Sequence, residues 1–323
     1  MLYPLTFHPI FKARVWGGRN LERKYGKALP PGVPVGESWE ISDRPGNESV
    51  IANGPLAGMN LHRLVELHRN ELLGPSRLKG NRFPLLVKIL DAQEKLSLQV
   101  HPPAHKAAAL GGEPKTEIWY IADATAGAEL YVGLKRGVSR AAFEQKIRDG
   151  SVADCFHRIP VKPGDAMFLP SGRVHAIGAG LVIFEIQQNS DTTYRVFDWN
   201  RVGLDGKPRE LHVPESLDSI DFNDCEPALV PNNLTEEGSI KRRPLVQDPL
   251  FTVEVISASA TVATALNPRQ MQIVGCLSGA LCVAADRAAV RLAPGGFCLV
   301  PASLGRVMVT VENEASFLRV EAG

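Results

Sequence analysis

Short strand-length segments, each bounded by glycine or proline, follow one another along most of this sequence. The clearest of them are residues 83–90, 96–101, 117–122, 129–134, 155–160, 166–170 and 180–188, and a second set runs from Phe251 to Val320. Many short strands separated by turn residues are typical of a sandwich or a barrel, in which two sheets bury their apolar faces against each other. The sequence therefore predicts a fold that is dominated by β-structure.

Two other segments have the periodicity of a helix. Residues 59–73 carry apolar side chains at helical spacing, and this segment stops at the pair Gly74 and Pro75. Ser139 is a suitable N-cap for a second helix over residues 140–148. We therefore expect a few helices beside the strands.

The chain is long enough for two domains. Its 323 residues are sufficient for two hydrophobic cores. The polar and proline-rich sequence between residues 222 and 244 has the composition of a linker. We predict a larger domain over residues 1–240, with an N-terminal extension and the helices, and a smaller C-terminal domain over residues 245–323, with the boundary near Arg243.

An internal repeat relates the two predicted domains. Residues 162–175 and residues 293–306 share a Pro-Gly turn, a short apolar strand, and then a proline followed by small residues. Each domain is therefore expected to carry a similar β unit. The first copy ends at His175, whereas the second has Arg306 at that position, so only the first copy keeps a metal-ligating side chain there.

Charge and hydropathy exclude several classes of partner. The formal net charge is +1, which gives no basic field for nucleic acid and favours a small-molecule substrate. No apolar run reaches the length that crosses a membrane, and residues 1–18 are interrupted by prolines and charged side chains. We expect a cytoplasmic protein without nucleic-acid or membrane partners, and the sequence does not indicate its oligomeric state.

The cysteines do not form a recognisable framework. They are odd in number and lack any Cys-x-x-Cys spacing, which argues against zinc held by thiolates and against a disulfide scaffold. Most of them are expected to be buried as small apolar residues: Cys155, Cys225, Cys276, Cys282 and Cys298.

A Gln-x-His pair ends the strand predicted at residues 96–101. Side chains two residues apart leave the same face of a strand, so Gln99 and His101 point to one side and Leu98 and Val100 to the other. An amide oxygen and an imidazole nitrogen are both ligands for a divalent ion of the zinc type. On its own, such a pair is more often a hydrogen-bonded polar pair than part of a metal site.

Two further candidate ligands lie on other predicted strands. Glu117 begins a strand that is otherwise almost entirely apolar, and a buried carboxylate there requires either a metal or a salt bridge with Lys or Arg. His175 follows a Pro-Ser-Gly turn, where a histidine is often simply solvated. Together the candidates form a nitrogen and oxygen set that suits zinc with one position left for substrate: Gln99, His101, Glu117 and His175.

Four motifs, taken in their order along the chain, together resemble those of one protein family. They are Gln-Val-His-Pro at 99–102, Lys-Thr-Glu-Ile-Trp-Tyr at 115–120, Pro-Gly-Asp-x4-Pro-x-Gly-x-x-His-Ala-Ile-Gly at 163–178, and Gln-Gln-Asn-Ser-Asp-x-Thr-Tyr-Arg-Val-Phe-Asp-Trp at 187–199. The chain resembles the type I mannose-6-phosphate isomerases, in their short bacterial form, through nearly its whole length.

This resemblance implies a fold and a cofactor. The fold is a cupin jelly-roll barrel with a second, smaller jelly roll at the C-terminal end. The cofactor is one zinc ion per chain, and the resemblance assigns its ligands to Gln99, His101, Glu117 and His175. The chain departs from long-form members at Thr116, where they carry proline, and it lacks their helical insertion, which affects the outer wall of the pocket.

The resemblance also implies a reaction, the interconversion of D-mannose 6-phosphate and D-fructose 6-phosphate through an enediolate. Arg195 matches the arginine that the family places over the substrate, where it would stabilise an oxyanion; the alternative is a surface ion pair with Asp198 or Asp191. Lys115 and Arg201 are candidates for the phosphate contact. Lys115 beside a dication is expected to have a lowered pKa and to compete for the role of the base, which the sequence does not identify.

Two functions from other classes share this fold. An iron-dependent cupin oxygenase uses two histidines and one carboxylate, but it leaves three positions open and has no need of Gln99. A non-catalytic cupin that binds a sugar phosphate is the second, because fold alone does not determine function. Turnover with zinc separates all three functions.

Overall fold

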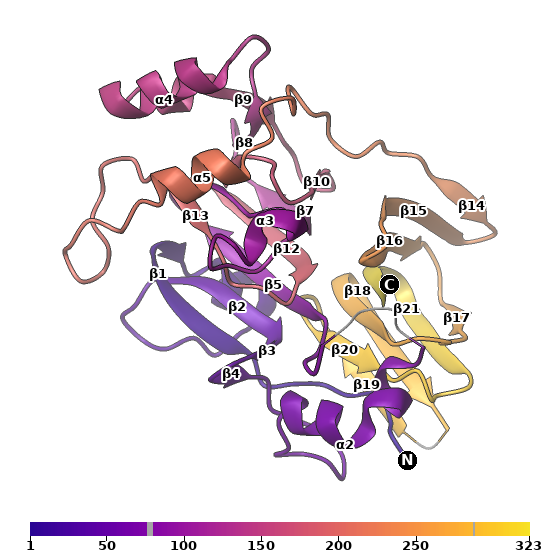
Figure 1. Cartoon of the computed structure of the whole chain (residues 1–323). Coiled ribbons are helices and arrows are strands. Elements are labelled where there is room, and N and C mark those ends of the chain that lie inside the picture. Colours follow the sequence, from indigo (N-terminus) through magenta and orange to yellow (C-terminus); the bar gives the residue numbers. More distant parts are fainter. Residues whose placement is uncertain (76–79, 287) are drawn as a thin grey trace.

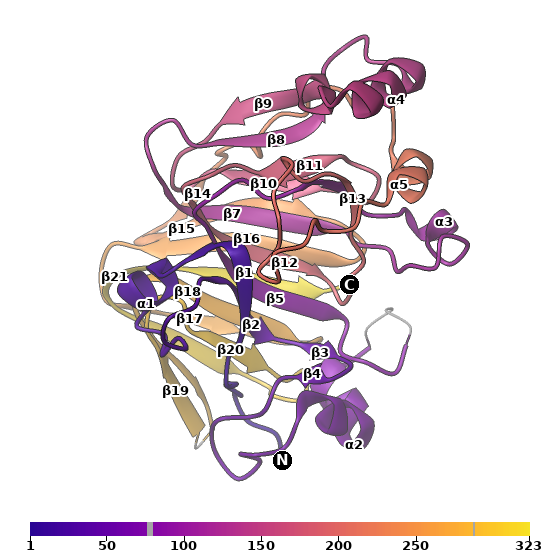
Figure 2. The same ribbon diagram turned by 90° about the vertical axis from the view of Figure 1, so that its left-hand side faces the viewer.

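Strands form three layers in the computed structural model, which describes residues 1–75, 80–286 and 288–323 (Figure 1). In Figure 2 the five-stranded sheet lies uppermost, and most of the C-terminal sheet lies below it. The first layer is a five-stranded sheet in the order β13 (Tyr194–Phe197), β6 (Leu98–Val100), β11 (His175–Ile177), β8 (Glu129–Leu134) and β9 (Phe156–Pro160).

The second layer is a six-stranded sheet. Its order is β1 (Ile10–Gly18), β2 (Val35–Ile41), β5 (Leu85–Ala92), β12 (Leu181–Gln188), β7 (Glu117–Ala124) and β10 (Ala166–Leu169). The short strands β3 (Asp43–Arg44) and β4 (Asn47–Glu48) form a separate hairpin after β2.

The third layer is the C-terminal eight-stranded sheet. Its path runs β14 (Thr235–Glu237), β15 (Ile240–Gln247), β16 (Phe251–Ala258), β21 (Val307–Ala322), β18 (Gln272–Ala285) and β19 (Ala288–Leu292). Two strands lie off this path, because β17 (Val262–Leu266) pairs with β21 and β20 (Phe297–Val300) pairs with β18.

The six-stranded sheet is buried on both faces, which explains why its strands are so apolar. Trp119 and Ile121 of β7 pack against the five-stranded sheet. Ile118 of the same strand belongs to a different cluster, which includes Phe251 and Leu318 of the C-terminal sheet. Successive side chains of a strand point to opposite faces, so one strand supplies both cores.

The helices lie outside these layers: α1 (Asn20–Tyr25), α2 (Leu61–Leu73), α3 (Ala104–Ala107), α4 (Arg140–Asp149) and α5 (Val213–Ser219), with a 3₁₀ turn η1 (Val152–Cys155). Asn60 caps α2 by accepting a hydrogen bond from Arg63 N, and Ser139 caps α4 through Ala142 N. The helices predicted at 59–73 and 140–148 are thus present, and three shorter ones add to them. None of the helices in the described residues is long and apolar enough to span a membrane.

The prediction of a β-dominated fold with few helices is confirmed. The predicted boundary near Arg243 falls inside β15, and Arg243 donates to the carbonyl oxygen of Gly164 in the turn before β10. Leu5 forms a bridge with Leu299 of β20, so the N-terminal segment also packs on the C-terminal sheet. The division into residues 1–240 and 245–323 therefore stays a prediction.

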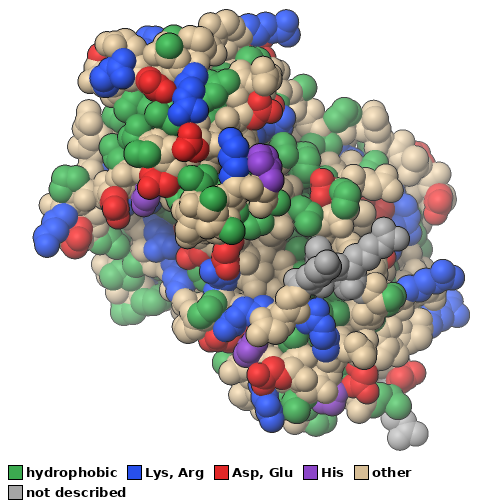
Figure 3. Space-filling view, viewed as in Figure 1, with side chains coloured by type: hydrophobic (Ala, Val, Ile, Leu, Met, Phe, Trp, Pro, Cys, Tyr) green, Lys and Arg blue, Asp and Glu red, His purple; other side chains and the backbone are tan. Residues whose placement is uncertain are grey.

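The surface carries mixed charge. On the face shown in Figure 3, basic and acidic side chains are interspersed, in agreement with the net charge of +1. Exposed apolar side chains include Val202, Leu204 and Leu211, which all lie in the segment between β13 and α5. All five cysteines are free, and most of them are buried, as expected: Cys155, Cys276 and Cys298.

Candidate active site and metal centre

The facing five- and six-stranded sheets bring the predicted metal ligands together. Gln99 lies in β6 and His101 directly follows it, while His175 begins β11 and pairs with Gln99 across the antiparallel ladder. Glu117 begins β7 in the opposite sheet. Leu98 points the other way, into the core beneath α4 and α5, as the alternation of the strand predicts.

The distances between the ligand atoms suit a single ion. The atoms of His101, Glu117 and His175 all lie within 4.8 Å of one another, and all three residues are buried. Glu117 Oε2 is 3.7 Å from His101 Nε2, and Glu117 Oε1 is 3.4 Å from His175 Nε2. Bond lengths of about 2.0 to 2.1 Å place the ligands of a tetrahedral zinc ion roughly 3.3 to 3.5 Å apart.

Backbone carbonyls orient both imidazoles. His101 Nδ1 lies 2.8 Å from the carbonyl oxygen of Thr192, and His175 Nδ1 lies 2.9 Å from that of Arg173. A carbonyl oxygen only accepts, so each Nδ1 carries the proton and each Nε2 keeps its lone pair. Metal-ligating histidines are commonly held in this way, with the second nitrogen donating to a carbonyl or carboxylate.

The ligand atoms lack hydrogen-bond partners. Among the described residues, His101 Nε2 and both carboxylate oxygens of Glu117 have no hydrogen-bond partner, although they are buried. Each buried polar atom without a partner costs about 1 to 3 kcal/mol, and more if it is charged. Coordination of a cation would remove this cost, so the residues present fit a divalent metal ion.

The protonation states of the three residues also suit metal binding. Burial lowers the pKa of His101 to about 4 and lowers the pKa of His175, which makes both imidazoles neutral at pH 7. Burial acts to raise the pKa of Glu117, but the charge of Lys115 and the nearby His101 lower it by more, so this carboxyl is ionised. Metal ions bind the neutral imidazole and the ionised carboxylate.

Gln99 is the fourth predicted ligand, and its amide reaches the same place. Gln99 Nε2 lies 3.4 Å from His175 Nε2. A half-turn of the terminal amide exchanges its nitrogen and oxygen, which would present Oε1 to an ion held by His175. The structure therefore brings all four predicted ligands to one point.

Lys115 lies directly beside the ligands. Its Nζ is 2.6 Å from Glu117 Oε2, which makes a close ion pair. Burial lowers the pKa of Lys115, but the carboxylates of Glu117 and Glu185 raise it by more, so it lies above the ordinary value. The neighbouring carboxylates therefore raise the pKa of Lys115, whereas a lowered pKa was expected for a lysine beside a dication.

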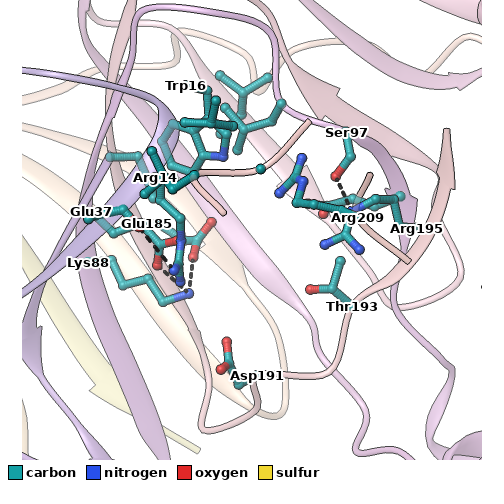
Figure 4. Close-up of a pocket in the computed structure, with 18 of the residues that line it drawn as sticks. Arg14, Trp16, Glu37, Lys88, Ser97, Glu185, Asp191, Thr193, Arg195 and Arg209 are labelled. Carbon is teal, nitrogen blue, oxygen red and sulfur yellow. Dashed lines mark hydrogen bonds and ion pairs between the residues drawn. The ribbon is translucent and has the colours of Figure 1, made fainter. Parts of the chain in front are cut away.

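A polar cavity of about 610 Å³ opens beside the metal ligands (Figure 4). Gln99 and Lys115 both line it, whereas His101, Glu117 and His175 are not part of its lining. Volumes of about 300 to 1,000 Å³ are usual for sites that bury a small molecule. The cavity is therefore large enough for a substrate of metabolite size that reaches the metal ligands past Gln99.

One wall of this cavity is a row of alternating charges (Figure 4). Arg14 Nε lies 2.6 Å from Glu37 Oε1, and Lys88 Nζ lies 3.8 Å from Glu37 Oε2 and 3.2 Å from Glu185 Oε1. Glu185 Oε1 is 3.9 Å from Lys115 Nζ. The row therefore connects the far wall of the cavity with the metal ligands.

The opposite wall carries Arg195, which pairs with Gln99 across β13 and β6. Arg195 Nε donates to Ser97 Oγ at 3.3 Å, and Nη1 donates to the Glu210 carbonyl at 2.7 Å. Among the described residues it forms no ion pair with a carboxylate, so the alternative of a surface ion pair with Asp198 or Asp191 is not observed. Burial lowers the pKa of Arg195, and the charge of Arg209 lowers it further.

Arg201 does not reach the cavity. Its Nη2 lies 2.9 Å from Asp198 Oδ1, and Nη1 donates to the backbone of Lys95. The chain after Arg201 turns back on itself through a bridge between Val202 and Pro208, and this return brings Arg209 to the cavity instead. Its position therefore does not support the phosphate contact predicted for Arg201.

Several cavity residues are absent from the sequence prediction: Arg14, Glu37, Lys88, Glu185 and Arg209. Lys88 and Glu185 carried a signal, because Lys88 is the single charged residue in the apolar run 85–90 and Glu185 is the single charged residue of β12, and they face each other across β5 and β12. A charge in a buried strand requires a partner. This argument was applied to Glu117 and would have applied equally to these two residues.

Comparison with known proteins agrees with this geometry. A family model described as phosphomannose isomerase type I, catalytic domain, matches residues 5–145. The protein named probable mannose-6-phosphate isomerase GmuF from Bacillus subtilis (strain 168) is 35% identical over 324 residues, which are 98% of this chain and 99% of that protein. A mannose-6-phosphate isomerase from Streptococcus mutans is 40% identical over 264 residues, 81% of each chain.

The fold agrees as well. The crystal structure of the mannose 6-phosphate isomerase from Bacillus subtilis matches with a TM-score of 0.90 and 31% sequence identity, and the match covers 99% of this chain and 100% of that chain. These findings confirm the resemblance carried by the four motifs. The chain therefore belongs to the type I phosphomannose isomerases, a family of enzymes.

Proposed function

We propose that this enzyme interconverts D-mannose 6-phosphate and D-fructose 6-phosphate with one zinc ion per chain. The observation that carries the proposal is the buried group of His101, Glu117 and His175, whose unpartnered ligand atoms lie beside a polar cavity. The printed names of the relatives that match most of the chain support the choice of substrate.

The ligand chemistry supports zinc. Two imidazole nitrogens, a carboxylate oxygen and the amide oxygen of Gln99 form a set that zinc binds with one position left for substrate. Bound zinc would supply a Lewis acid for the carbonyl and hydroxyl oxygens of the opened sugar. An iron oxygenase with two histidines and one carboxylate would leave Gln99 without a role.

The two walls of the cavity support a substrate that carries a phosphate. Arg195 has no carboxylate partner among the described residues, and Arg209, which is bonded to Asp198, lies on the same wall (Figure 4). A phosphate dianion would supply the negative charge that Arg195 lacks. Both Arg201 and Arg209 are bonded to Asp198, but only Arg209 lines the cavity, so we assign the phosphate contact to Arg209 in place of Arg201.

Arg195 and Lys115 are the proposed catalytic side chains. Arg195 is opposite the metal ligand Gln99, where its guanidinium would stabilise negative charge on the enediolate as a proton moves between C2 and C1. The raised pKa of Lys115 favours its ammonium form, which donates hydrogen bonds and cannot take up a proton. We propose that Lys115 holds a substrate oxygen.

The proposal is tested by assay of the purified enzyme with mannose 6-phosphate, together with metal analysis of the same sample. We expect turnover that a chelator abolishes and added zinc restores, with about one zinc ion per chain. Turnover that survives complete removal of metal would contradict the proposal. Binding of the sugar phosphate without turnover in the zinc-loaded protein would favour a binding module.

A further inference from the structure

Close contact between β1 and β2 shapes the wall of the cavity that is farther from the metal ligands. A Cβ on Gly17 would lie 2.3 Å from Gly36 N, and a Cβ on Gly36 would lie 2.6 Å from both Arg14 Cβ and Trp16 Cζ3. Glycine at both positions lets the two strands approach this closely. As a result, Arg14 and Trp16 lie over β2 and line the cavity.

Glu37 fixes the orientation of Arg14. Its Oε1 is 2.6 Å from Arg14 Nε, and its Oε2 accepts a hydrogen bond of 2.6 Å from Trp39 Nε1. Burial acts to raise the pKa of Glu37, but Lys88 and Arg14 lower it by more, to about 2. Glu37 is therefore an ionised carboxylate held from several sides, and it holds Arg14 in turn.

This ion pair leaves hydrogen-bonding atoms free on the cavity side. Arg14 Nη2 has no partner within the described part of the chain, and Nη1 makes only a long contact of 3.4 Å with the Ala13 carbonyl. Figure 4 shows Arg14 beside Glu37, Glu185 and Lys88, across the cavity from Arg195. The guanidinium thus has donors available for a ligand between the two walls.

The two walls differ in their charge balance. On the wall of Arg14, each cation is matched by a carboxylate, because Glu37 pairs with Arg14 and Glu185 pairs with Lys88. On the opposite wall, Arg209 is bonded to Asp198, but Arg195 has no such partner among the residues that the structure describes. A charge-balanced wall offers donors and acceptors to neutral groups, whereas an unbalanced cationic wall attracts an anion.

We infer that Arg14 and Glu37 bind hydroxyl groups of the sugar and so determine which sugar phosphates the enzyme accepts. A hydroxyl both donates and accepts, and an arginine beside a glutamate offers the complementary pair. Sites that bind a substrate hydroxyl with buried polar groups discriminate strongly against analogues that lack it, since those groups are then left unpaired. This inference rests on the proposed function, because it takes a sugar phosphate as the ligand.

The test separates binding of the sugar from binding of the phosphate. Arg14→Met is compared with the wild type in three measurements: kcat/KM for mannose 6-phosphate, the Kd of fructose 6-phosphate by calorimetry, and the Ki of inorganic phosphate. We expect kcat/KM and the affinity for fructose 6-phosphate to fall about 10- to 100-fold, as for the loss of hydrogen bonds to a charged group, with the Ki unchanged.

Two further variants control for a merely structural effect. Arg19 forms a similar ion pair with Glu22 at 2.7 Å, and it does not line the cavity, so Arg19→Met is the matched control and should leave all three measurements unchanged. Arg14→Lys keeps the charge but loses the planar fork, and it should bind fructose 6-phosphate more weakly than the wild type. If Arg14→Met does not fold, the same three measurements on Arg14→Lys test the inference.

The outcomes distinguish this inference from the proposed function. If wild-type turnover is present and both Arg14 variants bind fructose 6-phosphate normally, the inference fails and the proposed function stands. Equal losses for fructose 6-phosphate and inorganic phosphate would also overturn it, because they indicate a general distortion of the cavity. If the wild type binds fructose 6-phosphate through Arg14 without turnover, the proposed function fails and the inference stands.

Discussion

Gln272 in the C-terminal sheet occupies the register position that Glu117 occupies in the six-stranded sheet. Glu117 of β7 is opposite Leu169 of β10, and Gln272 of β18 is opposite Val300 of β20. Leu169 and Val300 are equivalent residues of the internal repeat. Gln272 is buried and accepts a hydrogen bond from Arg319 Nε at 3.2 Å, so an amide bonded to arginine stands where the other copy has a proposed metal ligand.

From this equivalence we predict that residues 245–323 bind no metal. The second copy lacks counterparts of both Glu117 and His175, because Gln272 and Arg306 stand in their places. Elemental analysis should give about one zinc ion per chain. A second tightly bound ion that remains after the substitution His101→Ala would show this assignment to be wrong.

The metal ligands are expected to be individually indispensable. We predict that His101→Ala, His175→Ala and Glu117→Ala each remove the zinc and lower kcat/KM by at least about a hundredfold, because the Lewis acid contributes several kcal/mol. His105→Ala is the matched control, since His105 is exposed on α3 near the same motif. Full turnover by a ligand variant without bound metal would contradict the site.

The arginines are expected to differ in their kinetic effects. Arg195→Ala should lower kcat and kcat/KM together if Arg195 acts on the transition state, whereas Arg209→Ala should mainly raise KM. Arg201→Ala should change KM less than Arg209→Ala, because both arginines are bonded to Asp198 but only Arg209 lines the cavity. An unchanged kcat for Arg195→Ala would remove this residue from the chemistry.

The Glu37 carboxylate is expected to make stability depend on acid pH. Its pKa is about 2 in the folded protein and 4.5 in the ordinary state, so the unfolded chain binds the proton more readily. Glu37 therefore stabilises the fold above pH 4.5 and loses this contribution as the pH falls from 4.5 toward 2.

Urea unfolding at pH 7 and pH 4 measures this contribution. The difference in free energy of unfolding between the wild type and Glu37→Gln should be smaller at pH 4 by about 1 kcal/mol. A difference that is the same at both pH values would contradict the depressed pKa of Glu37.

Gly36 is expected to matter for substrate binding, although it carries no side chain. In Gly36→Ala the added Cβ would lie 2.6 Å from Arg14 and Trp16, which must then move. We expect a rise in KM for mannose 6-phosphate and a loss of about 1 to 3 kcal/mol of stability from overpacking. Gly305→Ala is the control, because a Cβ there meets no atom within 4 Å, and equal effects of the two substitutions would refute this role.

Much of the fold follows from local signals in the sequence. The strand predicted at residues 129–134 has exactly the observed bounds of β8, and the N-cap at Ser139 begins α4 as expected. The short helices α1, α3 and α5 were missed, because none is long enough to show helical periodicity. The participation of residues 2–5 in the C-terminal core was also missed, since it depends on tertiary packing.

The candidate site was likewise predictable only in part from the sequence. Gln99, His101, Glu117 and His175 stand in motifs with fixed spacing, and the structure brings their side chains together. Arg14 stands in no such motif: its place in the cavity depends on the register shifts of β1 against β2. Such irregular pairing, with shifts between Lys12 and Ala13 and between Ala13 and Gly18, is set by contact with the neighbouring strand and not by a local pattern in the sequence.

The bridge between Leu5 and Leu299 has a consequence for synthesis of the chain on the ribosome. Each backbone N–H donates to the carbonyl oxygen of the other residue, at 2.9 and 2.8 Å, and both side chains belong to the largest core cluster. The partner of an early segment is thus translated near the end, and contacts of such large sequence separation form slowly. Until β20 has left the ribosome, Leu5 and its apolar neighbours lack their partner strand, and the nascent chain is open to aggregation during that time.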